Sequence, residues 1–133
     1  GSAAQAVGFV DTDFPLFRAA DAYLMLAECA ARGAADKAKG LAALNAVRER
    51  AGVATLSSFT AQDVLNERGR ELLWEGHRRS DLIRFGQFTT ADYLWEYKGS
   101  VKEGVAVADY RNLFPLPPAD VNANSNLKQN AGY

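Results

Sequence analysis

Two alanine-rich segments joined by the short link GAAD constrain the fold of this chain more than any other feature. Each segment places apolar residues at the three- and four-residue spacing of one helix face. In the first segment, which ends at Gly33, these residues are Leu16, Ala20, Tyr23, Leu24, Ala27 and Ala31. In the second, which ends at Gly52, they are Ala38, Leu41, Leu44, Val47 and Ala51. A link this short leaves the two predicted helices only an antiparallel packing.

The ends of the two predicted helices and their length indicate the type of hairpin. Asp13 is a candidate N-cap for the first helix, with Pro15 in its first turn. The glycine after each helix stands where a left-handed residue commonly follows a helix end. From Leu16 to Ala51 the pair spans 36 residues, close to the ~34 residues of a tetratricopeptide repeat. One such hairpin cannot bury its own faces, so further helices must cover it.

The rest of the chain predicts those further helices and then a different kind of structure. A third helix is predicted over residues 58–77, where Thr60 and Asp63 resemble a capping box. A shorter helix is predicted over residues 79–85. The remainder is rich in glycine, proline, asparagine and aromatic residues, which predicts a long irregular C-terminal strap. The predicted fold class is therefore mainly α: a tetratricopeptide-like antiparallel hairpin, further helices and this strap, with one helical turn from Pro118.

Length and composition limit the class of protein. With 133 residues the chain has room for one domain with one core, predicted over residues 14–133 after a loose lead-in at 1–13 whose first two residues resemble a tag remnant. The formal net charge of -1 argues against a generic nucleic-acid binder, which needs a basic surplus. No apolar run approaches the ~20 residues of a membrane span. Cys29, the single cysteine, is predicted to be a small buried apolar residue.

The segment from Glu67 to Phe88 interleaves arginines and acids with large apolar residues. Spacing alone pairs Arg68 with Glu71, and Arg78 with Glu75, on one helix face. Arginine neighbours keep carboxylates ionised, whereas a general acid needs a raised pKa, so no catalytic residue is predicted. The interleaved acids also oppose binding of phosphates. The prediction is a structural ion-pair lattice made of Glu67, Arg68, Glu71, Glu75, Arg78, Asp81 and Arg84.

The residue types of the chain bear on metal and ligand sites. His77 is the only histidine and no set of cysteines accompanies it, so neither a metal site nor a cofactor is predicted. Tyr93, Trp95 and Tyr97 alternate with period two, and an extended strand would place all three on one face. Such a face suits the C–H patches of a sugar ring. The competing interpretation is that these rings fasten the strap to the helices.

The charged segment resembles the signature of the SusD/RagB family, the starch-utilisation-type lipoproteins of Gram-negative outer membranes. The matching positions in this segment are Glu67, Arg68, Glu71, Leu72, Glu75, Gly76, Arg78, Asp81, Leu82, Arg84, Phe85 and Gly86. Three more blocks resemble the family in the same order: FRAADAYLMLAECAARG, ALNAVRERAGV and LFPLPPADVNANSNLKQNAGY.

The chain also departs from the family pattern. Ser125 and Ala131 stand where the family usually has proline, Asp120 replaces a glutamate, and Arg79 and Ser80 replace bulky aromatic residues. Family members are several hundred residues long, so the resemblance implies that residues 14–133 correspond to a C-terminal part of a longer protein.

The resemblance implies a function that the residues alone do not. Family members are not enzymes: they hold an oligosaccharide or another nutrient at the cell surface and cap a TonB-dependent, SusC-like transporter. Their membrane attachment is an N-terminal lipid anchor, which this sequence lacks. A tetratricopeptide-type protein-interaction module, which would hold a peptide in the groove of the helices, is the alternative. A glycoside hydrolase is a third possibility, for which Asp92 and Glu96, close to Trp95, are the only acids worth testing.

Overall fold

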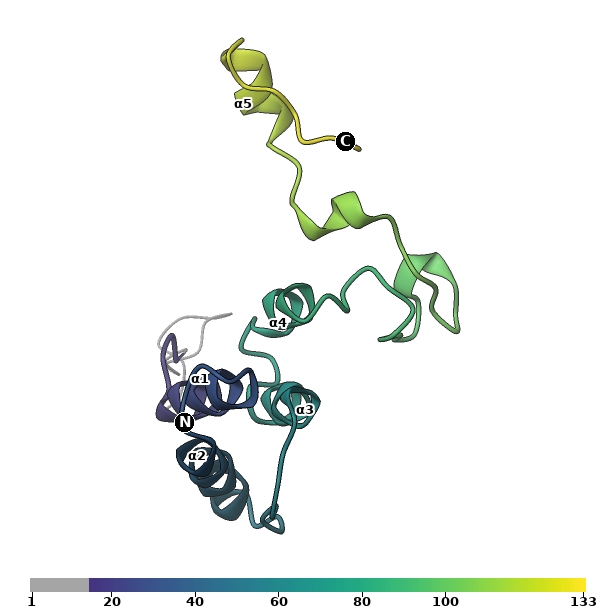
Figure 1. Ribbon diagram of the computed structural model, residues 1–133. Coiled ribbons are helices and arrows are strands. Elements are labelled where there is room, and N and C mark those ends of the chain that lie inside the picture. The colour runs from purple at the N-terminus through teal and green to yellow at the C-terminus, as the bar shows by residue number, and fades with distance from the viewer. Residues whose placement is uncertain (1–14) are drawn as a thin grey trace, which may run out of the picture. The chain divides into compact units, whose positions relative to one another are not determined.

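The computed structural model describes residues 15–133, so the expected N-cap Asp13 lies outside the described residues. The chain divides into two compact units, with the boundary between Arg78 and Arg79. The elements are α1 (Ala19–Ala31), α2 (Lys37–Arg50), α3 (Ala61–Glu71), α4 (Arg78–Arg84), the 3-10 helices η1 (Lys98–Ser100) and η2 (Asp109–Asn112), and α5 (Pro118–Ala123) (Figure 1). Every regular element of residues 15–133 is thus a helix, and the predicted mainly α class is confirmed. None of these helices is long and apolar enough to cross a membrane.

The first unit is built around α1, which packs against both α2 and α3 (Figure 1). Its core contains one side of each helix. The buried apolar residues are Ala20, Leu24, Ala27, Ala30, Leu44, Val47, Phe59, Val64 and Leu72. The two alanine-rich helices approach closely at Gly40 of α2, where an added Cβ would lie 2.3 Å from the Cβ of Ala30.

Several details of the predicted helix faces were wrong. Helix α1 begins at Ala19, because Arg18 is extended and its guanidinium is bound elsewhere in the unit. Leu16 therefore precedes the helix and is 73% exposed. Cys29 is exposed, since it points away from the face that Leu24 and Ala27 share. Three other expected core positions, Tyr23, Ala38 and Ala51, are exposed as well.

The predicted capping box at the start of α3 is confirmed. The backbone N–H of Asp63 donates to the Thr60 hydroxyl at 3.2 Å, and the Thr60 N–H donates to the Asp63 carboxylate at 2.8 Å. The predicted end at residue 77 was wrong, because α3 stops at Glu71. The chain turns there through left-handed conformations at Trp74 (φ 67°) and Gly76 (φ 79°), which no helix accommodates.

The second unit is mostly irregular, and amide side chains help to hold its C-terminal strap. Gln129 accepts from the N–H of Leu116 at 2.8 Å and donates to its carbonyl at 2.9 Å. Asn130 donates to the carbonyl of Phe114 at 2.7 Å. The predicted helical turn is present as α5, which starts at Pro118. Side-chain hydrogen bonds of this kind hold a strap in place without a sheet.

Candidate functional site

Arg18 forms the most extensive ion pair of the first unit. Its guanidinium donates to Glu75 at 2.9 and 2.7 Å, to the Glu71 carboxylate at 2.9 Å, and to the Glu71 carbonyl at 2.8 Å. The hydrogen bonds from Arg18 lower the pKa of Glu75. The same bonds raise the pKa of Arg18 above its ordinary value. Both partners therefore remain charged, and the residues just before α1 are tied to the end of α3.

Two further acids of α3 lie between arginines from different helices. Glu67 accepts from Arg48 of α2 at 2.6 Å and from Arg70 of α3 at 2.6 Å. Glu71 accepts from Arg50 of α2 at 2.6 Å in addition to Arg18. The pairing of Arg68 with Glu71 that spacing suggested is replaced by these contacts, because arginines from α2 and from the start of α1 reach the acids.

Arg68 is instead paired with an acid of α1. Its Nη1 donates to Asp21 at 2.7 Å, and the two side chains are only 3% and 8% exposed. Spacing suggested Glu75 as the partner of Arg78, but Nη1 of Arg78 donates to the carbonyl of Leu65 at 2.9 Å. This guanidinium occupies the space beside Gly69, where an added Cβ would lie 2.9 Å from Nη1.

The remaining two members of the predicted lattice lie in α4. Arg84 donates to Asp81 at 2.9 Å, and the Asp81 side chain is 1% exposed. Across residues 15–133, no group of three or more histidine, cysteine, aspartate or glutamate side chains is arranged to hold a metal ion. We interpret the charged segment as structural, since its carboxylates accept charge-assisted hydrogen bonds from arginines of the same chain.

Replacing Glu71 by alanine tests this interpretation. We expect the melting temperature to fall by several degrees, equivalent to about 1–2 kcal/mol, because two arginines lose an acceptor. The loss is limited because Arg18 keeps Glu75 and Arg50 is 63% exposed. Thermal denaturation followed by circular dichroism measures the shift. An unchanged melting temperature together with lost ligand binding would assign Glu71 to a ligand site instead.

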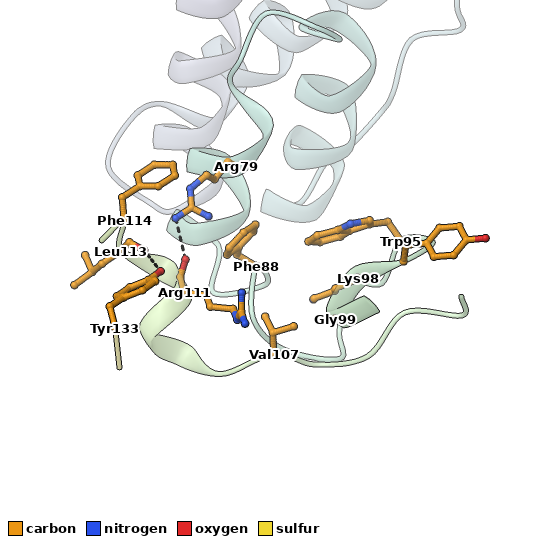
Figure 2. Close-up of a pocket in the computed structure, with 11 residues that line it drawn as sticks. Arg79, Phe88, Trp95, Lys98, Gly99, Val107, Arg111, Leu113, Phe114 and Tyr133 are labelled. Atoms are coloured by element: carbon orange, nitrogen blue, oxygen red, sulfur yellow. Dashed lines mark hydrogen bonds between the residues drawn. The ribbon is translucent and has the colours of Figure 1, made fainter. Parts of the chain in front are cut away.

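The second unit contains a pocket of about 270 Å³ (Figure 2). Aromatic and cationic side chains dominate its lining, which is contributed by the segments before and after η1 and by the strap. The lining residues are Arg79, Phe88, Trp95, Tyr97, Lys98, Gly99, Val107, Arg111, Leu113, Phe114 and Tyr133. All of these residues belong to the second unit.

The three aromatic residues predicted as a sugar platform lie close together, but in a different arrangement. Trp95 stacks on Phe88 with ring centroids 5.9 Å apart, and Tyr93 lies against Trp95 at 6.2 Å. Trp95 and Tyr97 line the pocket, whereas Tyr93 does not. The predicted strand was wrong, because Tyr97 is left-handed (φ 64°) and the chain turns into η1. Trp95 remains 39% exposed and Tyr97 66% exposed.

Two cations that the sequence did not single out are fixed in the wall of the pocket. The Arg79 guanidinium lies between the rings of Phe88, at 4.4 Å, and Phe114, at 4.1 Å (Figure 2). It also donates to the carbonyl of Arg111 at 2.8 Å. Lys98 lies 4.8 Å from the Trp95 ring and is buried. These contacts join positions far apart in the sequence, so no local pattern could reveal them.

The hydrogen bonds of the Lys98 side chain go to two backbone carbonyls. Its Nζ donates to the carbonyls of Thr90, at 2.5 Å, and Tyr93, at 2.7 Å. Burial lowers the pKa of Lys98 below its ordinary value. Asp92 and Glu96, the acids considered for hydrolysis, are both exposed and do not line the pocket.

Comparison with known proteins places the chain in a family. Residues 3–133 match the model of the SusD family. The chain is 45% identical to the starch-binding protein SusD of Bacteroides thetaiotaomicron over 126 residues, which cover 94% of this chain and 22% of that protein.

Solved structures of surface glycan-binding proteins are also similar to this chain. Surface glycan-binding protein A from Bacteroides uniformis is 30% identical with a TM-score of 0.74, over 89% of this chain and 27% of that chain. Surface glycan-binding protein A from Bacteroides thetaiotaomicron in complex with laminarihexaose is 28% identical with a TM-score of 0.74, over 88% of this chain and 24% of that chain. The chain thus spans about a quarter of the length of these relatives, which are named as binding proteins and not as enzymes. This chain belongs to the SusD family.

Proposed function

We propose that this chain is part of a non-catalytic glycan-binding protein that works with a TonB-dependent, SusC-like transporter at the outer membrane. The 45% identity to a starch-binding protein supports the class of ligand. The family resemblance supports a lipid-anchored position at the cell surface and the transporter as the partner. In this proposal residues 14–133 are a C-terminal part of the longer protein, and the arginine–carboxylate pairs of the first unit hold its helices in register.

The pocket of the second unit is the feature of this chain that carries the proposal. Two of its aromatic side chains, Trp95 and Tyr97, are more than a third exposed and so are accessible to a ligand. A sugar ring has one apolar C–H face, which packs on such a ring while its hydroxyl groups remain hydrated. The stacking of Phe88 under Trp95 fixes the orientation of the indole, so little conformational entropy is lost on binding.

Replacing Trp95 by alanine tests this site. We expect the affinity for soluble maltooligosaccharides, measured by isothermal titration calorimetry, to fall by about tenfold or more, as for loss of a stacked aromatic contact. The fold should persist, because the indole is partly exposed and lies outside the core of the first unit.

Trp74→Ala is the matched control. Trp74 is 91% exposed, belongs to the first unit and does not line the pocket. The Trp74→Ala variant should bind the oligosaccharides with the affinity of the parent chain. If Trp95→Ala loosens the fold by circular dichroism, or if the parent chain binds no glycan, Trp95 is a packing residue and the site is wrong.

A further inference from the structure

We propose that the pocket of the second unit recognises the carboxylate of an acidic sugar, such as a uronic acid residue within a glycan. The proposal rests on the glycan-binding function proposed above and specifies the ligand class. It goes beyond the name of the starch-binding relative, because starch carries no carboxylates.

The charged side chains that line the pocket are all cationic. Three cationic side chains line it, Arg79, Lys98 and Arg111, and no acidic side chain does. The hydrogen bonds of Arg79 and Lys98 all go to uncharged carbonyl oxygens. Within residues 15–133, none of the three has a carboxylate within ion-pair distance. Asp92 acts on Lys98 through space without forming an ion pair, so the cations of the pocket are at most partly offset by the protein.

Several arginines of the first unit are bound by carboxylates instead. There Arg18, Arg48 and Arg68 each have a carboxylate within 2.9 Å. Placing charge in a partly dehydrated site is costly unless an opposite charge accompanies it. An anion bound in the pocket of the second unit would supply the charge that the first unit supplies internally.

Arg111 is the residue available for direct contact. It is exposed, and its guanidinium makes one recorded contact among the described residues, at 5.5 Å from the Tyr110 ring. Its backbone is held in place, because its carbonyl accepts from Arg79. Figure 2 shows its side chain on the same side of the pocket as Phe88 and Val107. A guanidinium so placed can bind a carboxylate with two parallel hydrogen bonds.

The aromatic side chains of the lining favour a ligand in which the carboxylate belongs to a sugar. Trp95 and Tyr97 present flat apolar faces next to the cations. A uronic acid combines one apolar ring face with one carboxylate, so it can satisfy both parts of the lining at once. An acidic peptide would satisfy only the cations.

The test compares an oligogalacturonate with a maltooligosaccharide of the same length, by isothermal titration calorimetry on the 133-residue chain. We expect the uronate to bind about tenfold more tightly at low salt, and this preference to shrink as salt screens the charges. Arg111→Gln should bring the ratio of the two affinities close to one, and Arg111→Lys should give an intermediate ratio. Lys102→Gln removes an exposed cation outside the lining and should keep the ratio of the parent chain.

The outcomes separate this inference from the function on which it rests. Binding of the neutral oligosaccharide as tight as that of the uronate would overturn the acidic-sugar proposal and leave the glycan-binding function intact. Binding of polyglutamate but of neither sugar would overturn both and make the pocket a site for acidic peptides. A folded chain that binds none of the three also overturns both.

Discussion

Replacing Asp21 by alanine is expected to lower the free energy of unfolding by about 3–5 kcal/mol, the largest loss among the substitutions considered. Asp21 in α1 and Arg68 in α3 are joined at 2.7 Å, with side chains 8% and 3% exposed. The alanine variant removes the carboxylate at 2.7 Å from a guanidinium whose side chain is buried, so the cost of burying that charge is no longer offset by this pair. Urea denaturation followed by circular dichroism measures the loss.

A double substitution separates two contributions to the free energy of unfolding: the cost of removing one partner of the ion pair, and the net stabilisation by the pair as a whole. Asp21→Leu with Arg68→Met replaces both charges by apolar side chains, which often costs little where one partner alone costs much. The double variant should recover most of the stability that Asp21→Ala loses. A loss of under about 1 kcal/mol in Asp21→Ala would show that Arg68 is satisfied without Asp21, and would contradict the interpretation of this pair as a lock between α1 and α3.

The helices could be predicted because their signals are local. The spacing of Leu24, Ala27, Leu44 and Val47 places one face of each helix in the core, and all four are buried. The helix ends were harder, because tertiary contacts set them. Arg18 is extended to reach Glu71 and Glu75, a contact across more than fifty positions that no window of sequence contains.

In the candidate site, too, some residues could be selected from the local sequence and others only from the fold. Trp95 and Tyr97 could be selected from their spacing and chemistry, although the strand used to argue for them does not form. Arg79, Phe114 and Tyr133 could not, because the strap brings them to the pocket from positions up to 54 residues apart (133 − 79). The charged residues of the predicted lattice could be selected from the sequence, whereas the contacts of Glu67 with Arg48 and of Arg68 with Asp21 depend on how the helices pack.

The second large effect is expected at Gly40, where alanine should destabilise the chain by about 3 kcal/mol. Within a helix, glycine to alanine is normally stabilising by about 1 kcal/mol, so propensity predicts the opposite sign. The added Cβ would lie 2.3 Å from the Cβ of Ala30 and 3.1 Å from the Phe59 ring. Both neighbours are buried, at 3% and 5% exposure, so α1 and α2 must move apart to make room.

Gly69→Ala is the matched comparison, because it adds the same methyl group inside α3. There the nearest atom is Arg78 Nη1 at 2.9 Å, the far end of a flexible side chain, so we expect a change within about 1 kcal/mol.

Moving the methyl group across the interface completes the test of the close approach between α1 and α2. Ala30→Gly combined with Gly40→Ala removes the atom with which the new Cβ collides. We expect this double variant to be more stable than Gly40→Ala alone, although glycine inside α1 costs about 1 kcal/mol. The coupling between the two positions should then be favourable, as it is for residues in direct contact. If Gly40→Ala stabilises the chain, or if the two substitutions are simply additive, the helices do not approach as closely as the distance between Gly40 and Ala30 requires.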